Sequence, residues 1–425
     1  MNILLKNATY INWQSLNFKK CNIVVNGGVN GKIKMLDNTD KTINESDFEI
    51  IDCSGKLVSK SFACGHHHVY SALAKGMNAP KKIPGNFYEI LKYVWWTLDK
   101  CLTQEMIEYS ALTTAIACAK NGITFVIDHH ASPNFVKDSL DTIARAFEKV
   151  GVSHLLCYEI SDRDGKKIAE QGLEETKSFL QNNQGLVGLH ASFTVDNNTL
   201  KKAVKLSADT NSGIHIHVAE DIYDQDNCLN NYNLRVVERL NNFGVLDFSK
   251  TILGHCLYLN ENEKELIKNS KSWIVQNTES NLNNNVGYFN SCGLGEKIML
   301  GTDGMHSDML RSAKAAFFVG QGFDTIDYNS AYIRFRNVHN YISENNFTGD
   351  GENNLVILDY DTPTEINKDN FFGHFIFGIE SKHVQHVISN GKLIIKDKQI
   401  LTVDENEILI NSRKLSKELW KKMSD

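Results

Sequence analysis

The fold is decided by residues 57–70, LVSKSFACGHHHVY. The apolar part of this stretch predicts a strand over Leu57–His68, and the side chains of a strand alternate between its two faces. His66 and His68 therefore share one face, and His67 lies on the other. Two imidazoles on one face at a strand end can share a divalent metal ion. A polar turn that is rich in His by chance explains these residues equally well. Later stretches of the sequence are therefore needed to choose between a metal site and a chance turn.

Seven more strand candidates follow along the chain, with helical patterns between them. The strands are 124–128, 153–159, 186–190, 214–220, 251–255, 273–276 and 298–303, and the helices include 104–120, 139–150, 199–210, 233–242 and 262–269. Each strand–helix step fits a right-handed crossover to a parallel neighbour. Eight such units form a (β/α)8 TIM barrel, an α/β fold whose chemistry lies at the carboxyl ends of the strands.

Nearly all of these strands end on a polar side chain. The residues at the strand ends are His66, His68, Asp128, His129, His130, Glu159, His190, His217, Glu220, His255, Asn277 and Asp303. Chance can supply one or two polar strand ends, but not a set around the whole barrel. The pattern therefore predicts a polar site at one mouth of the barrel, and it favours a metal site over a chance turn at residues 66–68.

Both ends of the chain are rich in short strand patterns. Residues 1–57 contain four, at 3–5, 22–25, 32–35 and 49–51, and the tail contains 354–358 and 386–395. Neither end has enough strands to close a core alone, so we expect both termini to build one small β-sandwich. The predicted domains are 1–57 and 349–425 for the sandwich, the latter with a terminal helix, and 58–348 for the barrel.

Bulk composition excludes several classes of protein. A formal net charge of -6 over 425 residues, without a basic run, argues against nucleic acid and anionic membranes as partners. Scattered cysteines without a CxxC pair predict reduced thiols. No apolar segment approaches membrane-spanning length, and the first residues lack the apolar region of a signal peptide. We therefore expect a soluble, cytoplasmic protein.

Five stretches together resemble a known family. Residues 58–77, VSKSFACGHHHVYSALAKGM, resemble the first-strand motif of the amidohydrolase superfamily, in its branch of cytosine, guanine and S-adenosylhomocysteine deaminases and triazine hydrolases. GLHASFT at 188–194, HIHVAE at 215–220, GHC at 254–256 and GTDG at 301–304 resemble its fourth-, fifth-, sixth- and eighth-strand motifs. The stretches at 65–73, 127–133 and 302–309 are similar to SsnA-type aminohydrolases, which are found with selenium-dependent purine metabolism.

The resemblance implies one divalent metal ion, held by His66, His68, His217 and Asp303. Three imidazoles and one carboxylate suit zinc, with iron(II) as the alternative. His215 shares the face of His217 and could replace it as a ligand, but the three-residue step to Glu220 favours His217. The ends of the third and fourth strands lack the Lys that members with two metals carry. A single metal favours deamination of an aromatic ring.

The resemblance also implies three catalytic residues. Glu220 would carry protons to the ring nitrogen and then to the departing amine, provided that the strand turns after His217. Asp303 would accept the proton of the attacking water, and His255 would orient the hydroxide or polarise the tetrahedral oxygen. His190 would bind the substrate. The structural alternatives are a helix cap for Glu220 and a core histidine for His255.

Four further residues are predicted near the mouth of the barrel. His129, His130 and His306 are extra imidazoles, for which we predict a rim position and contact with an anionic or carbonyl-rich substrate, or a second metal ion. Trp96, in the first loop after a barrel strand, would cover a flat heterocycle, although helix packing explains it equally well.

The resulting prediction is a hydrolase that acts on carbon–nitrogen bonds other than peptide bonds. We expect an aminohydrolase of a purine-like or related heterocycle, with a small-molecule substrate and a homodimeric assembly implied by the resemblance. One alternative is a chlorohydrolase or cyclic amide hydrolase on the same site, because a hydroxide nucleophile does not select its leaving group. The other is a member of the family that binds without catalysis, against which the complete residue set argues.

Overall fold

Eight parallel strands form the centre of the computed structural model, which describes residues 2–37 and 44–424. They hydrogen-bond in two groups, β13-β12-β11-β10-β9 and β6-β7-β8. Single bridges, His67 to Asp303 and Ile160 to Leu189, join the groups into one barrel, which confirms the predicted (β/α)8 fold. The strands are β6 (Phe62–His67), β7 (Ile123–His130), β8 (Ser153–Tyr158), β9 (Val187–Ala191), β10 (Ile214–Val218), β11 (Ile252–His255), β12 (Trp273–Gln276) and β13 (Ile298–Leu300).

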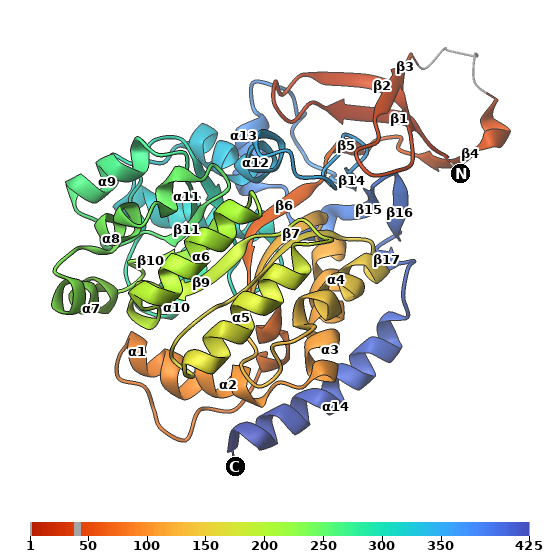
Figure 1. Ribbon diagram of the computed structural model, residues 1–425. Helices are drawn as coiled ribbons and strands as arrows, with labels where there is room; N and C mark the ends of the chain where they lie inside the picture. The colour runs from red at the N-terminus through yellow and green to blue at the C-terminus, as the bar shows by residue number, and fades with distance from the viewer. Residues whose placement is uncertain (1, 38–43, 425) are drawn as a thin grey trace.

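Both ends of the chain build a second sheet beside the barrel, as predicted (Figure 1). Its strand order is β17-β16-β15-β14-β5-β1-β2-β3, and β4 pairs with β1. Alternate side chains, among them Leu5, Ile23, Ile357 and Ile388, form a common buried core between the two ends. The strands are β1 (Asn2–Ile11), β2 (Phe18–Val25), β3 (Ile33–Leu36), β4 (Phe48–Asp52), β5 (Leu57–Lys60), β14 (Leu355–Leu358), β15 (Val384–Ser389), β16 (Lys392–Lys396) and β17 (Gln399–Ile400).

The predicted strand Leu57–His68 is two strands, and this prediction was wrong at Ser61. The first strand, β5, pairs with β1 and β14 in the outer sheet, whereas β6 pairs with β7 in the barrel. Between them, the Ser61 N–H donates to the Asn354 carbonyl at 3.0 Å, and the Ser61 hydroxyl lies 2.6 Å from Thr124 Oγ1. The chain thus passes from the outer sheet to the barrel at Ser61, whose backbone bonds next to the outer sheet and whose side chain bonds to a barrel strand. The domain limits at 57/58 and 348/349 stay a proposal.

Helices surround the barrel. Thr103 caps the N-terminus of α3, and Gly151, at φ 93°, ends α4 at the bounds that the sequence predicts. The last helix, α14, lies against α3 (Figure 1). Its Trp420 Nε1 donates to the carbonyl of Leu73. The helices are α1 (Phe87–Ile90), α2 (Trp96–Cys101), α3 (Gln104–Lys120), α4 (Ser139–Val150), α5 (Lys166–Phe179), α6 (Asn197–Asp209), α7 (Ile222–Tyr232), α8 (Val236–Asn242), α9 (Glu261–Lys268), α10 (Thr278–Asn283), α11 (Met309–Phe323), α12 (Tyr328–Glu344), α13 (Phe371–Phe377) and α14 (Glu405–Ser424).

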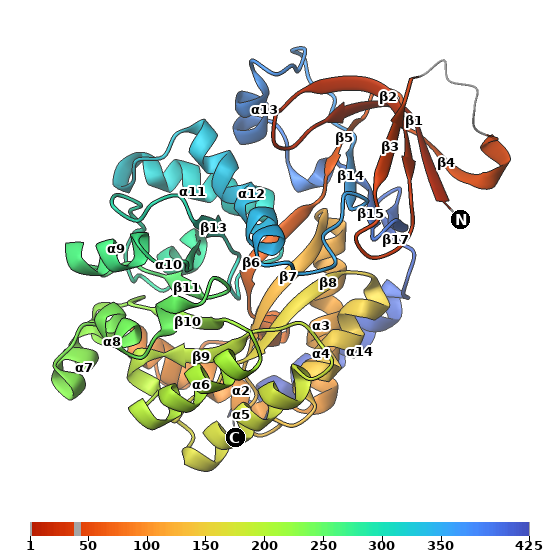
Figure 2. The same cartoon turned by 45° about the horizontal axis from the view of Figure 1, so that its top comes forward.

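Two hydrophobic layers show which side chains face the barrel interior. Phe125 and Leu155 belong to a core inside the strands, whereas Val126 and Leu156 pack against the surrounding helices. The strands β7 and β8 lie side by side (Figure 2). Because strand side chains alternate, the inward rows continue to His129 on β7 and to Glu159 just after β8. No helix within residues 2–37 and 44–424 has both the length and the apolar character needed to cross a bilayer.

Candidate active site

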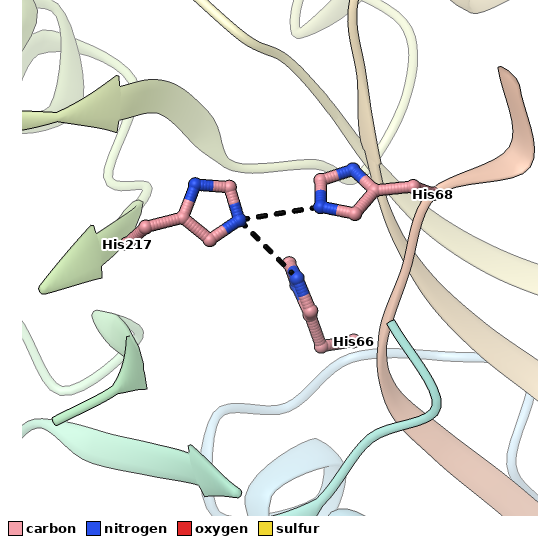
Figure 3. Close-up of side chains that lie close together, drawn as sticks. All are labelled: His66, His68 and His217. Carbon is pink, nitrogen blue, oxygen red and sulfur yellow. Dashed lines mark hydrogen bonds between the residues drawn. The ribbon is translucent and has the colours of Figure 1, made fainter. Parts of the chain in front are cut away.

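Three imidazoles converge at the carboxyl ends of β6 and β10. His217 Nε2 lies 3.2 Å from His68 Nε2 and 3.3 Å from His66 Nε2, and all three rings are buried (Figure 3). The Asp303 carboxylate, which follows β13, joins them. Its Oδ1 lies 3.3 Å from His68 Nε2 and 3.9 Å from His66 Nε2. Four side chains that are up to 237 positions apart in the sequence therefore meet at one point.

The hydrogen-bond partners of these rings decide which nitrogen carries the hydrogen. His68 Nδ1 lies 2.6 Å from the carbonyl oxygen of His129, and His217 Nδ1 lies 2.9 Å from that of His190. A nitrogen that faces a carbonyl donates, so Nε2 of each neutral ring presents a lone pair. Burial, the largest cause, lowers the pKa of both His68 and His217, which keeps the rings neutral.

The geometry fits a metal ion. The lone pairs on Nε2 of His68 and His217 face each other with no hydrogen between them, which is unfavourable unless a cation lies there. Zinc binds histidine nitrogens at about 2.0–2.1 Å in tetrahedral geometry, which separates two ligand nitrogens by about 3.3–3.4 Å. The observed separations of 3.2 and 3.3 Å match this spacing. These residues would therefore hold a divalent ion without rearrangement.

His215 lies behind this group. Its Nε2 is 2.9 Å from His66 Nδ1, on the side of the His66 ring that faces away from His217 Nε2. His215 is thus placed to orient His66, and the alternative that it replaces His217 as a ligand has no support in this geometry. His67 points to the other side of its strand, where its Nε2 lies 3.0 Å from the Ser307 hydroxyl.

Glu220 and His255 lie where the chain leaves regular strand geometry. The strand turns after β10 at Ala219, which has a φ of 46°, as the predicted role of Glu220 requires. His255, Cys256 and Asp303 also have positive φ values, of 66°, 55° and 53°. Such conformations cost about 1–3 kcal/mol each in residues other than glycine, and they gather at functional sites. Here they aim the side chains of three different strand ends into one space.

His255 presents an unused nitrogen to that space. Its Nδ1 donates to Asn281 Oδ1 at 2.7 Å, which directs Nε2 toward Glu220 and Asp303. This buried Nε2 has no hydrogen-bond partner among the described residues, and it lies 3.5 Å from Glu220 Oε2 and 3.6 Å from Asp303 Oδ2. Burial raises the pKa of Glu220 to about 7. These three side chains surround one point and can hold an attacking water molecule there.

The space opens into a cleft at the mouth of the barrel. One wall is apolar and comes from residues 87–101, with Phe87, Leu91 and Trp96 among its side chains. His190 lines the cleft beside Trp96, with ring centroids 5.9 Å apart, and its Nδ1 is held by Thr194 Oγ1 at 2.7 Å. The predicted substrate-binding residues His190 and Trp96 thus lie on the wall, and their roles stay predictions.

The predicted rim position was wrong for His129 and His130. His129 is fully buried below the cleft, and its Nε2 donates to the Leu189 and His215 carbonyls across the barrel. His130 is also fully buried and is bonded to the Ser132 hydroxyl. His306 is paired with Glu279 outside the cleft. Strand β7 extends two residues beyond its predicted end, so His129 and His130 are both part of the strand, with only His129 facing the barrel interior.

The sequence pattern places one charged group, Glu159, at a strand end but gives it no specific role. Glu159 lines the cleft, and Arg163 bonds Glu159 Oε1 at 2.6 Å and also pairs with Asp99. Burial raises the pKa of Glu159, but His190, Arg163 and the His129 hydrogen bond together hold it well below its usual value. Burial raises the pKa of Asp99 to about 7. Alternation from Leu155 marks Glu159 as inward-facing, but no sequence pattern marks its contact with Arg163.

Comparison with known proteins finds a matching family and related deaminases. A family model described as Amidohydrolase family matches residues 58–337. The 5'-deoxyadenosine deaminase of Methanococcus vannielii is 24% identical over 432 residues, which cover 96% of this chain and 97% of the relative. The 5-methylthioadenosine/S-adenosylhomocysteine deaminase of Thermoanaerobacter pseudethanolicus is 24% identical over 445 residues, with 99% of both chains covered.

A solved structure has the same fold. The crystal structure of an adenosine deaminase from Xanthomonas campestris with bound zinc superposes with a TM-score of 0.83 at 16% identity, over 98% of both chains. At this identity the similarity concerns the fold alone.

Proposed function

This chain belongs to the amidohydrolase family, and from that premise we propose that it is a metal-dependent aminohydrolase that removes the amino group of a 6-aminopurine nucleoside. The single observation that supports this most strongly is the convergence of the His66, His68 and His217 nitrogens with Asp303 beside Glu220 and His255. A site that only binds its ligand needs no buried carboxylate with a pKa near neutrality next to a metal position.

The reaction exchanges an amino group for oxygen on a ring carbon. His66, His68, His217 and Asp303 would hold a divalent ion, which would lower the pKa of a bound water from about 16 to about 7 and so supply a nucleophile at neutral pH. Glu220 takes a proton from the attacking water and delivers it to the adjacent ring nitrogen. After the carbon–oxygen bond has formed, the second proton of that oxygen passes by way of Asp303 to the amine, the carbon–nitrogen bond breaks, and ammonia leaves. The ring carbon becomes a carbonyl carbon.

His255 and Asp303 act on the same oxygen. His255 Nε2 lies 3.6 Å from Asp303 Oδ2, so an attacking oxygen between these two atoms contacts both and is oriented by them. The Asn281 hydrogen bond fixes the ring of His255 so that its Nε2 faces that oxygen. The apolar wall with Phe87, Leu91 and Trp96 matches a flat heterocycle and excludes water from its faces.

The relatives support the proposed substrate class. Both curated relatives named above are deaminases of adenosine derivatives and cover nearly all of this chain. To test the proposal, the zinc-loaded protein is incubated with adenosine, 5'-deoxyadenosine, 5'-methylthioadenosine, guanine, cytosine and a chlorotriazine, and ammonia and chloride are measured. We expect ammonia from the adenosine compounds. Ammonia from none of them, or chloride from the triazine alone, would refute the proposal.

Finer points are proposals as well. Zinc is proposed as the ion because imidazole and carboxylate ligands suit it, with iron(II) as the alternative. A homodimer is proposed from the family resemblance, and the exposed aromatic side chains Phe318, Tyr328 and Phe377 form a cluster that suits an interface. The SsnA-type assignment, the link to selenium-dependent purine metabolism and a cytoplasmic location stay predictions from the sequence.

We expect kcat/KM to rise with pH between pH 5 and 7 and then to level off. Glu220 accepts the water proton only when it is ionised, and burial raises its pKa to about 7. Below that value the ionised fraction falls about tenfold for each pH unit. Initial rates with adenosine from pH 5 to 9, at saturating zinc, measure this profile. A rate that is constant or falling from pH 5 to 7 would contradict the assigned role.

A further inference from the structure

We propose that Glu159 is the residue that recognises the sugar of the substrate, by accepting a hydrogen bond from a ribose hydroxyl. This inference rests on the proposed function, because it takes a 6-aminopurine nucleoside as the substrate. It assigns a role to a buried carboxylate that the reaction itself does not use.

Glu159 lies on the side of the cleft that the reacting groups leave free. It follows β8, and its carboxylate lies within 4.8 Å of ring nitrogens of His190 and His217, whereas Glu220, His255 and Asp303 follow β10, β11 and β13. Around a closed barrel of eight strands, β8 is far from β12 and β13. A purine whose amino group lies between Glu220, His255 and Asp303 therefore extends its other end, which carries the sugar, toward Glu159 and His190.

The contacts of Glu159 leave it able to accept one more hydrogen bond on each oxygen. Arg163 Nη1 bonds Oε1 at 2.6 Å, and His129 Nδ1 lies 3.2 Å from Oε2. Each carboxylate oxygen accepts two hydrogen bonds, so one lone pair of each remains. The side chain is buried, lines the cleft and is held in one orientation from two sides.

The chemistry of the substrate selects its sugar as the partner. A carboxylate accepts hydrogen bonds and donates none. The free ring nitrogens of a 6-aminopurine nucleoside are acceptors, and its amino group is the one that reacts. The remaining donors are the sugar hydroxyls. Acidic residues bind ribose hydroxyls in dinucleotide-binding folds for the same reason.

Arg163 positions this carboxylate together with the apolar wall. Its guanidinium is buried, pairs with Asp99 and Glu159, and lies 5.3 Å from the ring centroid of Trp96. The same side chain thus fixes the hydrogen-bond acceptor and the aromatic ring beside it. The sugar of the substrate would contact Glu159 and its base would contact Trp96, and Arg163 fixes these two side chains relative to each other.

The test compares kcat/KM for adenosine, 2'-deoxyadenosine and 3'-deoxyadenosine in the zinc-loaded wild type and in Glu159→Gln. In the wild type we expect at least one deoxy compound to be about 10- to 100-fold poorer than adenosine, as for a hydrogen bond to a charged group. In Glu159→Gln this ratio falls about fivefold or more. A ratio within one preparation does not depend on the fraction of active protein.

Glu263→Gln is the matched control. Glu263 is a fully buried carboxylate that pairs with Arg235, as Glu159 pairs with Arg163, but it lies outside the cleft. This variant should keep the wild-type ratio. Equal use of all three compounds by the wild type, an unchanged ratio in Glu159→Gln, or a loss of bound zinc in Glu159→Gln would overturn the inference while the deaminase function stands. No deamination of any of the three compounds would refute the proposed function itself.

Discussion

Glu220→Gln is expected to lower kcat by about 10²- to 10⁴-fold, the usual contribution of a positioned general acid–base residue. Gln keeps the shape of the side chain but cannot carry a proton from water to the ring nitrogen. Glu220 Oε2 lies 3.5 Å from His255 Nε2, and Asn284 donates to Glu220 Oε1 at 3.5 Å. Because none of these contacts involves the proposed metal ligands, bound zinc should remain at the wild-type level.

Asp221→Asn is the control for Glu220→Gln. Asp221 is the next residue and carries the same charge, but its Oδ1 accepts from the Tyr223 N–H as the N-cap of α7. Asn caps a helix as well as Asp does, so this variant should keep stability and activity near the wild type. Single-turnover rates and zinc content by mass spectrometry measure both variants. Wild-type kcat in Glu220→Gln would remove Glu220 from the reaction.

His217→Ala is expected to release the metal ion and to lower kcat/KM by more than about 100-fold. It removes the ring whose Nε2 lies closest to both other imidazole nitrogens, at 3.2 and 3.3 Å. Losing a residue that only supports a ligand costs about 10- to 100-fold in metal affinity or activity, so losing a ligand should cost more. Zinc content after dialysis against a weak chelator, together with kcat/KM, measures the effect.

His215→Ala is the matched variant, because His215 is also a buried histidine of β10 and supports His66 from behind at 2.9 Å. We expect it to bind zinc more weakly but to keep an intermediate activity, within the 10- to 100-fold range. The variant that loses more zinc and more activity identifies which of the two histidines, His217 or His215, is the metal ligand. If His215→Ala lost the metal ion while His217→Ala kept it, the ligand assignment would be wrong.

Sequence patterns could locate much of this site because strand ends are local features. The predicted strand at Trp273–Gln276 has the bounds of β12, and helix α3 begins after its Thr103 cap as predicted. The step from His217 to Glu220 required a turn, and Ala219 supplies it with its positive φ. In each case a few neighbouring residues contain the whole physical signal.

The errors came from pairing between distant segments. An apolar run reads as one strand over Leu57–His68, but Ser61 divides it because β5 and β6 have different partners. His129 and His130 follow an apolar strand and therefore resemble loop residues. They belong to β7 because β8 pairs with it in register up to His130 and Tyr158. The contact between Arg163 and Asp99 joins residues 64 positions apart, which no periodicity encodes.

Anomalous X-ray diffraction at the zinc absorption edge, from crystals of the zinc-loaded protein, would locate the ion directly. We expect one peak about 2.0–2.1 Å from Nε2 of His66, His68 and His217 and about 2.0–2.2 Å from an oxygen of Asp303. A peak at Glu159 and His190 instead, or no peak between the three imidazoles, would contradict the proposed metal site and the hydrolysis assigned to it.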